Sequence, residues 1–108
     1  MSELPKPYER FNVQFPDVAK AYEDYGRTTH EWGPLPPRVR QLVKLGMAIA
    51  SRSEGSVHSH VRRALETGVT RDEIYHVLLM AVTSIGFPAT IAAYTWINDV
   101  LDTEGRGD

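Results

Sequence analysis

The sequence contains no cysteine among its 108 residues. Disulfide bonds, thiolate catalysis and cysteine–zinc sites are therefore excluded for this chain. It also lacks any apolar run approaching the roughly 20 residues that cross a bilayer. The first eleven residues, MSELPKPYERF, are polar and contain prolines, so we expect no signal peptide. These absences predict a soluble cytoplasmic protein with no membrane partner.

An excess of positive charge is missing as well. Twelve lysines and arginines face 14 acidic residues, which gives a formal net charge of −2 at pH 7. Proteins that bind nucleic acid need a basic face, so the composition argues against a nucleic-acid partner. The hydrophobic share of 42% and the charged share of 24% are ordinary for a globular chain of one domain.

No segment carries a convincing alternation of apolar and polar residues, and the one candidate for a strand, SVHSH, is too short. Apolar residues instead recur at helical spacing. We therefore predict an all-α fold with about five helices, over residues 15–33, 36–53, 56–67, 70–85 and 88–101. Residues 1–14 show no periodicity and are predicted to form an N-terminal arm, followed by a single helical domain over residues 15–108.

Several residues mark the ends of these helices. Pro16 suits a first helical turn, where its missing N–H is not needed. Ser56 is expected to cap the third helix, and Gly68 suits the position just after its end. Thr70 and Glu73 have the spacing of a capping box, which predicts the start of the fourth helix.

The last helix, ATIAAYTWINDVL, is apolar on nearly every side. Such a helix is buried all round, either by its own domain or by a partner subunit. Since the chain is short and its last two helices carry much apolar surface, we expect a homo-oligomer.

The segment SRSEGSVHSHVRR holds the residues with chemical potential. His58 and His60 are two positions apart, so they point to opposite flanks of a helix and make a poor chelate. No acidic residue at helical spacing is expected to complete a metal site, although a metal shared between subunits stays open. Each histidine, His60 in particular, can act as a general acid or base or simply bond across a helix interface. His30 and His76 are expected to be structural or exposed to solvent.

The run HVRRALETGVTRDEIYHVLLMAVTSIGFPATIAAYTWINDVL resembles the carboxymuconolactone decarboxylase family, and the likeness extends upstream through LPPRVRQLVKLGMAIASRSEGSVHSH. It covers residues 35–101. The resemblance implies the helical fold of the alkylhydroperoxidase D type. It also implies a homo-oligomer built from dimers, commonly a hexamer.

One branch of this family reduces peroxides with a Cys-x-x-Cys pair, a histidine and a glutamate on the preceding helix. The two cysteine positions fall on Ser53 and Ser56, and the glutamate position falls on Gln41. A serine hydroxyl forms no disulfide and is a poor nucleophile without a base. Thiol peroxidase activity is therefore not expected.

The other branch resembles this chain in lacking the thiols. The likeness of this chain to the decarboxylase branch implies a cofactor-free decarboxylase, or lyase, that acts on a small anionic lactone or keto acid. His60 would then transfer the proton, and Glu54 would orient an imidazole. This interpretation predicts that the protein needs neither a metal nor a cofactor.

The same resemblance implies a group of cations that binds the substrate. Arg62 would hold a carboxylate, with Arg40 or Arg63 as a second guanidinium and His58 nearby. Arg62 and Arg63 are otherwise surface charges near the end of a helix. The alternative to an enzyme is a non-catalytic oligomer of the same fold that binds a small molecule or serves as a scaffold.

Overall fold

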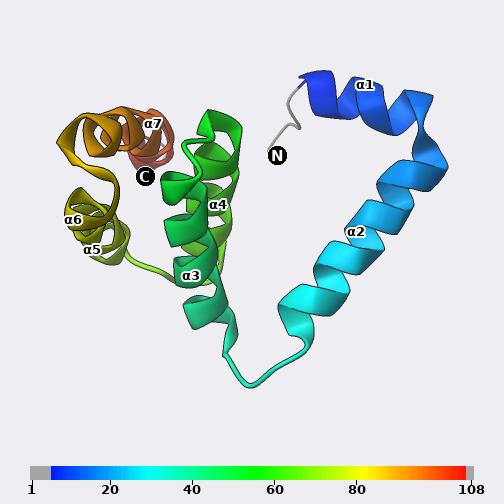
Figure 1. The fold of residues 1–108 in the computed structure, drawn as a ribbon, viewed down its shortest axis with the longest axis horizontal. Coiled ribbons are helices and arrows are strands. Elements are labelled where there is room, and N and C mark those ends of the chain that lie inside the picture. Colours follow the sequence, from blue (N-terminus) through cyan, green and yellow to red (C-terminus); the bar gives the residue numbers. More distant parts are fainter. Residues whose placement is uncertain (1–5, 107–108) are drawn as a thin grey trace. The chain divides into compact units, whose positions relative to one another are not determined.

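The computed structural model describes the backbone of residues 6–106 and the side chains as far as Thr103. Every regular element within this range is a helix, which confirms the all-α prediction. Seven helical segments follow one another along the chain (Figure 1): α1 (Lys6–Gln14), α2 (Pro16–Glu31), α3 (Pro37–Ala50), α4 (Glu54–Glu66), α5 (Arg71–Met80), α6 (Val82–Ile85) and α7 (Phe87–Arg106).

These helices divide into two compact units. Helices α1 and α2 belong to the first unit, which extends to Pro34, and helices α3 to α7 belong to the second, which begins at Leu35. The division lies 20 residues beyond the boundary at residue 14 that the sequence pattern indicated. The first five residues of the expected arm lie outside the described range.

The first unit is a pair of helices with little core. Tyr8 of α1 donates a hydrogen bond of 3.4 Å to the Glu23 carboxylate of α2, and the rings of Phe11 and Phe15 lie 5.1 Å apart. No helix was predicted over α1, because its apolar residues show no clear stripe and none of them is buried. Pro16 lies in the first turn of α2, as predicted. Ala19 is the single buried side chain among the described residues of this unit.

The second unit contains the hydrophobic core. Helices α3 and α4 pack closely along each other, and α4 and α5 both contact α7. The buried apolar side chains of this core are Leu45, Ala48, Ile49, Val57, Val61, Ala64, Val69, Ile74, Val77, Leu78, Ala93, Ile97, Val100 and Leu101.

Helix α4 begins two residues earlier than predicted. Ser53, not Ser56, is the N-cap: its backbone is extended, and its hydroxyl accepts a hydrogen bond of 3.3 Å from the Ser56 N–H. The preceding Arg52 has a positive φ of 58°, an uncommon conformation for a side-chain-bearing residue that closes the turn from α3. At the other end, Gly68 has a φ of 88°, which confirms its predicted place after the helix.

The capping box of α5 is present as predicted. The Thr70 hydroxyl accepts from the Glu73 N–H at 3.1 Å, and the Glu73 carboxylate accepts from the Thr70 N–H at 2.8 Å. The same carboxylate pairs with the Arg38 guanidinium of α3. The hydrogen bond from the Thr70 backbone, and then the one from Arg38, lower the pKa of the Glu73 carboxyl below its ordinary value.

The expected long fourth helix is interrupted at Ala81, and a separate turn, α6, follows. Gly86, with a φ of 91°, then reverses the chain before α7. Helix α7 is not buried all round within its unit. One face enters the core, whereas Phe87, Ile91 and Tyr94 are exposed. None of the helices in the described range is long and apolar enough to cross a membrane.

The burial pattern of α7 predicts the outcome of two matched substitutions. Ile97 has no exposed surface, whereas Ile91 on the same helix is 43% exposed. Ile97→Ala should lower the free energy of unfolding by about 2–5 kcal/mol, since it removes buried methyl groups and leaves a cavity. Ile91→Ala should cost much less in the same denaturant titration, and equal losses would contradict the described packing.

The lowered pKa of Glu73 predicts an acid-dependent contribution to stability. A carboxyl group with a lower pKa in the folded than in the unfolded chain stabilises the fold above the unfolded pKa. That contribution is lost as the pH falls through the folded pKa. Glu73→Gln should therefore flatten the acid limb of a plot of unfolding free energy against pH. Glu66→Gln, an exposed carboxylate on α4, is the control and should leave the acid limb steep.

Candidate functional site

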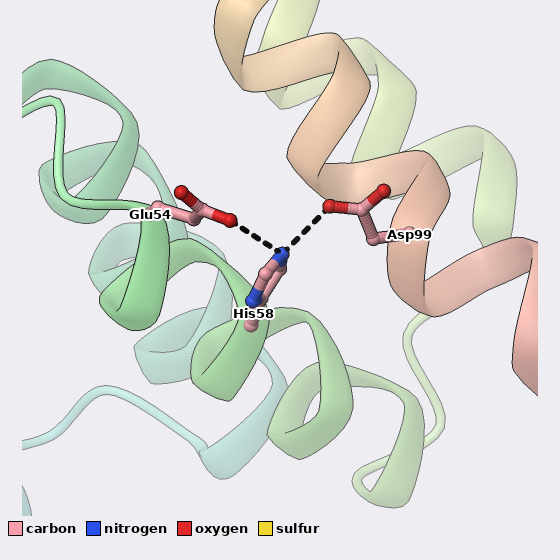
Figure 2. Close-up of side chains that lie close together, drawn as sticks. All are labelled: Glu54, His58 and Asp99. Atoms are coloured by element: carbon pink, nitrogen blue, oxygen red, sulfur yellow. Dashed lines mark hydrogen bonds and ion pairs between the residues drawn. The ribbon is translucent and has the colours of Figure 1, made fainter. Parts of the chain in front are cut away.

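The contact between α4 and α7 brings together His58 and Asp99, which are 41 residues apart in the sequence. The Nε2 atom of His58 lies 2.9 Å from Oδ2 of Asp99, within hydrogen-bond distance. Figure 2 shows the imidazole rising from α4 toward the aspartate on α7. The His58 side chain is 23% exposed and that of Asp99 is 49% exposed, so the pair lies at the edge of the core and is open to solvent.

Glu54 approaches the same ring nitrogen from one turn earlier in α4. Its Oε2 atom lies 4.0 Å from Nε2 of His58, and its side chain is 59% exposed. The two carboxylates thus converge on one nitrogen from different helices (Figure 2). Glu54, which the family resemblance assigned to orienting an imidazole, has the i, i+4 spacing to His58 that places two side chains on one face of a helix.

The geometry determines which ring nitrogen is free to react. An ionised carboxylate only accepts hydrogen bonds, so the Nε2 atom of His58 must carry the hydrogen that it donates to Asp99. In the neutral ring the other nitrogen, Nδ1, is then an acceptor. A carboxylate held in this way fixes the imidazole's tautomer and orientation.

The three side chains also have a composition that suits a divalent cation. One ligand atom from each of Glu54, His58 and Asp99 lies within 4.8 Å of the others. However, exposed acidic groups commonly gather without an ion, and a hydrogen bond fully explains the 2.9 Å contact. We therefore describe the group as a carboxylate–histidine cluster.

His60, the proton-transfer residue expected from the family resemblance, is not part of this cluster. It lies about 200° around α4 from His58, on the other flank of the core stripe. Its ring is half-buried, and its Nδ1 atom is enclosed by protein. Both histidines lie within α4, in agreement with the prediction that their side chains point to opposite flanks of a helix.

The three arginines that were expected to bind substrate have different surroundings. Arg62 follows His58 by one turn and is half-buried, yet within the described side chains it makes no hydrogen bond or ion pair. Arg63 is exposed on the neighbouring side of α4. Arg40 donates a hydrogen bond of 2.7 Å from Nε to the carbonyl of Leu35, so it holds the entry to α3.

The residues at the positions of the peroxidase thiols have a structural role here. Ser53 caps α4 through the backbone of Ser56, as described above. Gln41, at the position of the peroxidase glutamate, is buried, and its side-chain oxygen has no hydrogen-bond partner in the described range. A neutral amide at this position cannot relay a proton as a carboxylate does.

A separate apolar cavity of about 500 Å³ opens on the second unit. It lies between α3, α5 and α6, and its lining includes no residue of the carboxylate–histidine cluster and none of the predicted site residues. His76, which is exposed, lies at its polar rim with Glu73 and Ser84.

Asp99 is the site residue that the sequence did not reveal. Its segment, INDVL, was interpreted only as part of an apolar helix. A polar residue beside the buried positions Ile97 and Val100 was the one available signal, and it could not identify which helix Asp99 would face.

Comparisons with known proteins agree with the fold and with the motifs. The family model described as "Carboxymuconolactone decarboxylase family" matches residues 16–99. A 4-carboxymuconolactone decarboxylase from Acinetobacter baylyi is 31% identical over 71 residues, which are 66% of this chain and 53% of that protein. An uncharacterised protein from Haemophilus influenzae is 28% identical over 63 residues, which are 58% and 56% of the two chains. The matched region thus spans about half the length of these curated relatives.

A solved structure is similar to this chain over most of its length. It is the apo crystal structure of a carboxymuconolactone decarboxylase family protein from Legionella pneumophila. The TM-score is 0.77 at 20% identity, and the match covers 87% of this chain and 84% of the other. At that identity the likeness establishes the fold. Because the family model matches well over half of its residues, the chain belongs to the carboxymuconolactone decarboxylase family.

Proposed function

We propose that this chain is a cofactor-free lyase that removes CO₂ from a small anionic lactone or keto acid and moves a proton at carbon. The observation that supports this proposal most directly is the 2.9 Å contact between His58 and Asp99. This contact fixes the orientation of the His58 ring in a member of the family and leaves the Nδ1 atom of the ring free. The name of the Acinetobacter baylyi relative gives the substrate class.

The reaction needs one proton donor and no redox partner. The bond between the substrate carbon and its carboxylate breaks, CO₂ leaves, and the electron pair remains on the conjugated carbon skeleton. Protonated Nδ1 of His58 then delivers its proton to that skeleton, and water restores the imidazolium. Asp99 contributes by accepting the Nε2 hydrogen bond, which holds the ring in one orientation for the transfer.

Arg62 supplies the positive charge that an anionic substrate needs. Glu54 and Asp99 would repel a substrate carboxylate, whereas Arg62 lies one turn from His58 and has no partner within the described side chains. Its guanidinium can hold a carboxylate through two parallel hydrogen bonds. Glu54, at 4.0 Å from the imidazole, borders the His58 ring on the side of α4.

The role of His58 is tested by turnover of 4-carboxymuconolactone, measured as release of CO₂. His58→Gln should lower kcat about 10²- to 10⁴-fold, because it removes the proton donor. Asp99→Asn should lower it less, whereas Asp102→Asn, which makes the same charge change on an exposed position of α7, should not.

His60→Gln separates this proposal from the role that the family resemblance implies. If the His60 variant is inactive while folded His58→Gln retains full turnover, proton transfer belongs to His60. Wild-type turnover after exhaustive dialysis against a chelator should be unchanged, and its loss would instead assign the cluster to a metal. No turnover by the wild type would favour the non-catalytic alternative, a binding or scaffold protein.

The role of Arg62 is tested by separating binding from chemistry. Arg62→Gln should raise KM about ten- to a hundredfold with a smaller change in kcat, since a hydrogen bond to a charged group is worth about 1.5–3 kcal/mol. Arg52→Gln, on the exposed turn before α4, provides the control for net charge. A loss of kcat at unchanged KM would contradict an anchoring role for Arg62.

A further inference from the structure

The apolar cavity of the second unit has the dimensions of a small-molecule site. Its volume of about 500 Å³ lies within the range of about 300–1,000 Å³ that is typical of such sites. Leu42 and Ala50 line it from α3 and are eight residues apart, a rise of about 12 Å along the helix. Glu73 and Met80 line it from α5 and are seven residues apart, a rise of about 10 Å. The cavity therefore suits an elongated molecule rather than a single ion.

The walls of this cavity are apolar, and one position leaves room inside it. Val77 is buried, and Leu42 and Ile85 are half-buried against the core. Met80 is 57% exposed, and a methionine side chain adjusts readily to the shape of a ligand. Gly46 adds no side chain, and a methyl group built there would meet only Val77, at an ordinary contact distance of 3.8 Å. The space beside Gly46 is therefore open to a ligand.

The lining contains three polar side chains, of which two are available to a ligand. The carboxylate of Glu73 already accepts a hydrogen bond from the Thr70 N–H and pairs with Arg38. His76 and Ser84 are exposed, and their side chains make no hydrogen bond or ion pair within the described residues. An imidazole and a hydroxyl can each donate or accept a hydrogen bond, so they suit an uncharged hydrogen-bonding group.

The charges around the cavity disfavour an ionic ligand. Among the described residues that line it, none is a lysine or an arginine. The nearby guanidinium of Arg38 is held by Glu73. An anion would lose its water in apolar surroundings without gaining a counter-ion, which is unfavourable. A cation would meet a carboxylate whose charge Arg38 already balances.

We propose that the cavity between α3, α5 and α6 binds an uncharged, largely apolar small molecule, such as an alcohol, an ester or an arylamine, whose one hydrogen-bonding group meets His76 or Ser84. This site shares no residue with the carboxylate–histidine cluster and takes a ligand of different charge from the anionic substrate proposed above. It therefore does not depend on the proposed function. A protein partner fits less well, because a specific interface buries about 800 Å² on each side, more than one such cavity offers.

The first test uses N-phenyl-1-naphthylamine, an uncharged arylamine whose fluorescence rises in apolar surroundings. Wild-type protein should bind it saturably, with one molecule per chain. Gly46→Leu should weaken binding about tenfold or more, because the added side chain fills the cavity. Gly55→Leu is the control: a side chain there would meet nothing within 4 Å, and binding should be unchanged.

A second pair of variants tests the cavity without filling it. Met80→Gln places a polar amide in the lining and should weaken binding of N-phenyl-1-naphthylamine. Leu79→Gln alters the preceding residue, which is 65% exposed and does not line the cavity, so it should leave binding unchanged. Because both side chains are exposed, this pair stays informative even where Gly46→Leu fails to fold.

The third test measures selection against charge. 1-Anilinonaphthalene-8-sulfonate has the same rings with an added sulfonate, and it should bind the wild type about tenfold more weakly or worse, since the cavity offers the anion no partner. Glu73→Gln releases Arg38 to pair with the sulfonate and should narrow the difference between the two probes. Asp72→Asn removes the same charge from an exposed position outside the lining, and it should preserve the difference.

Four results would overturn the proposal. They are the absence of saturable binding of N-phenyl-1-naphthylamine, equal binding by the wild type and a folded Gly46→Leu variant, equal binding by Met80→Gln and the wild type, and equal affinity of the wild type for the two probes. Sedimentation should give the same mass for the wild type and Gly46→Leu. A smaller mass for the variant would assign the cavity to a second copy of the chain and would also contradict a small-molecule site.

Discussion

The packing of α4 between α3 and α7 is the constraint on which the site depends. Val57 and Val61 are fully buried, so the rotation of α4 about its own axis is fixed to within a small angle. That rotation places position 58 at the border of the core, facing α7. The apolar stripe of α7, through Ile97 and Val100, fixes position 99 in the same way. The 2.9 Å contact between His58 and Asp99 is therefore a product of hydrophobic burial on two helices.

An exposed ion pair contributes little to stability, because solvent screens it and ordering two side chains costs entropy. The His58–Asp99 pair is thus a poor explanation for why the second unit folds, and its value lies in holding an imidazole in one orientation. The cavity beside α3 and α5 is instead lined mainly by apolar side chains. The ion pair at its edge, among the described residues, joins Glu73 to Arg38. One unit therefore presents two surfaces with different chemistry, a carboxylate–histidine cluster and an apolar cavity.

Several helix ends in both units could be predicted from residue patterns, because their signals are local. The capping box at Thr70 and Glu73, the glycine after α4 and the proline in the first turn of α2 each depend on neighbours within four residues. The predictions failed where a choice depended on competing local options or on distant contacts. Two serines could cap α4, and the extended backbone of Ser53 decided between them. Asp99 needed the α4–α7 contact, which periodicity alone does not give.

The hydroxyl of Ser53 has a consequence for any attempt to give this fold sulfur chemistry. The family resemblance aligns Ser53 with the first thiol of the peroxidase branch, and its hydroxyl fixes the first turn of α4. Sulfur is a weak hydrogen-bond acceptor, so a cysteine at this position would weaken that helix start. Introducing sulfur chemistry would also require a second cysteine at Ser56 and a carboxylate in place of the buried Gln41 amide. Building a thiol pair into this chain thus demands several simultaneous changes, the first of which is destabilising alone.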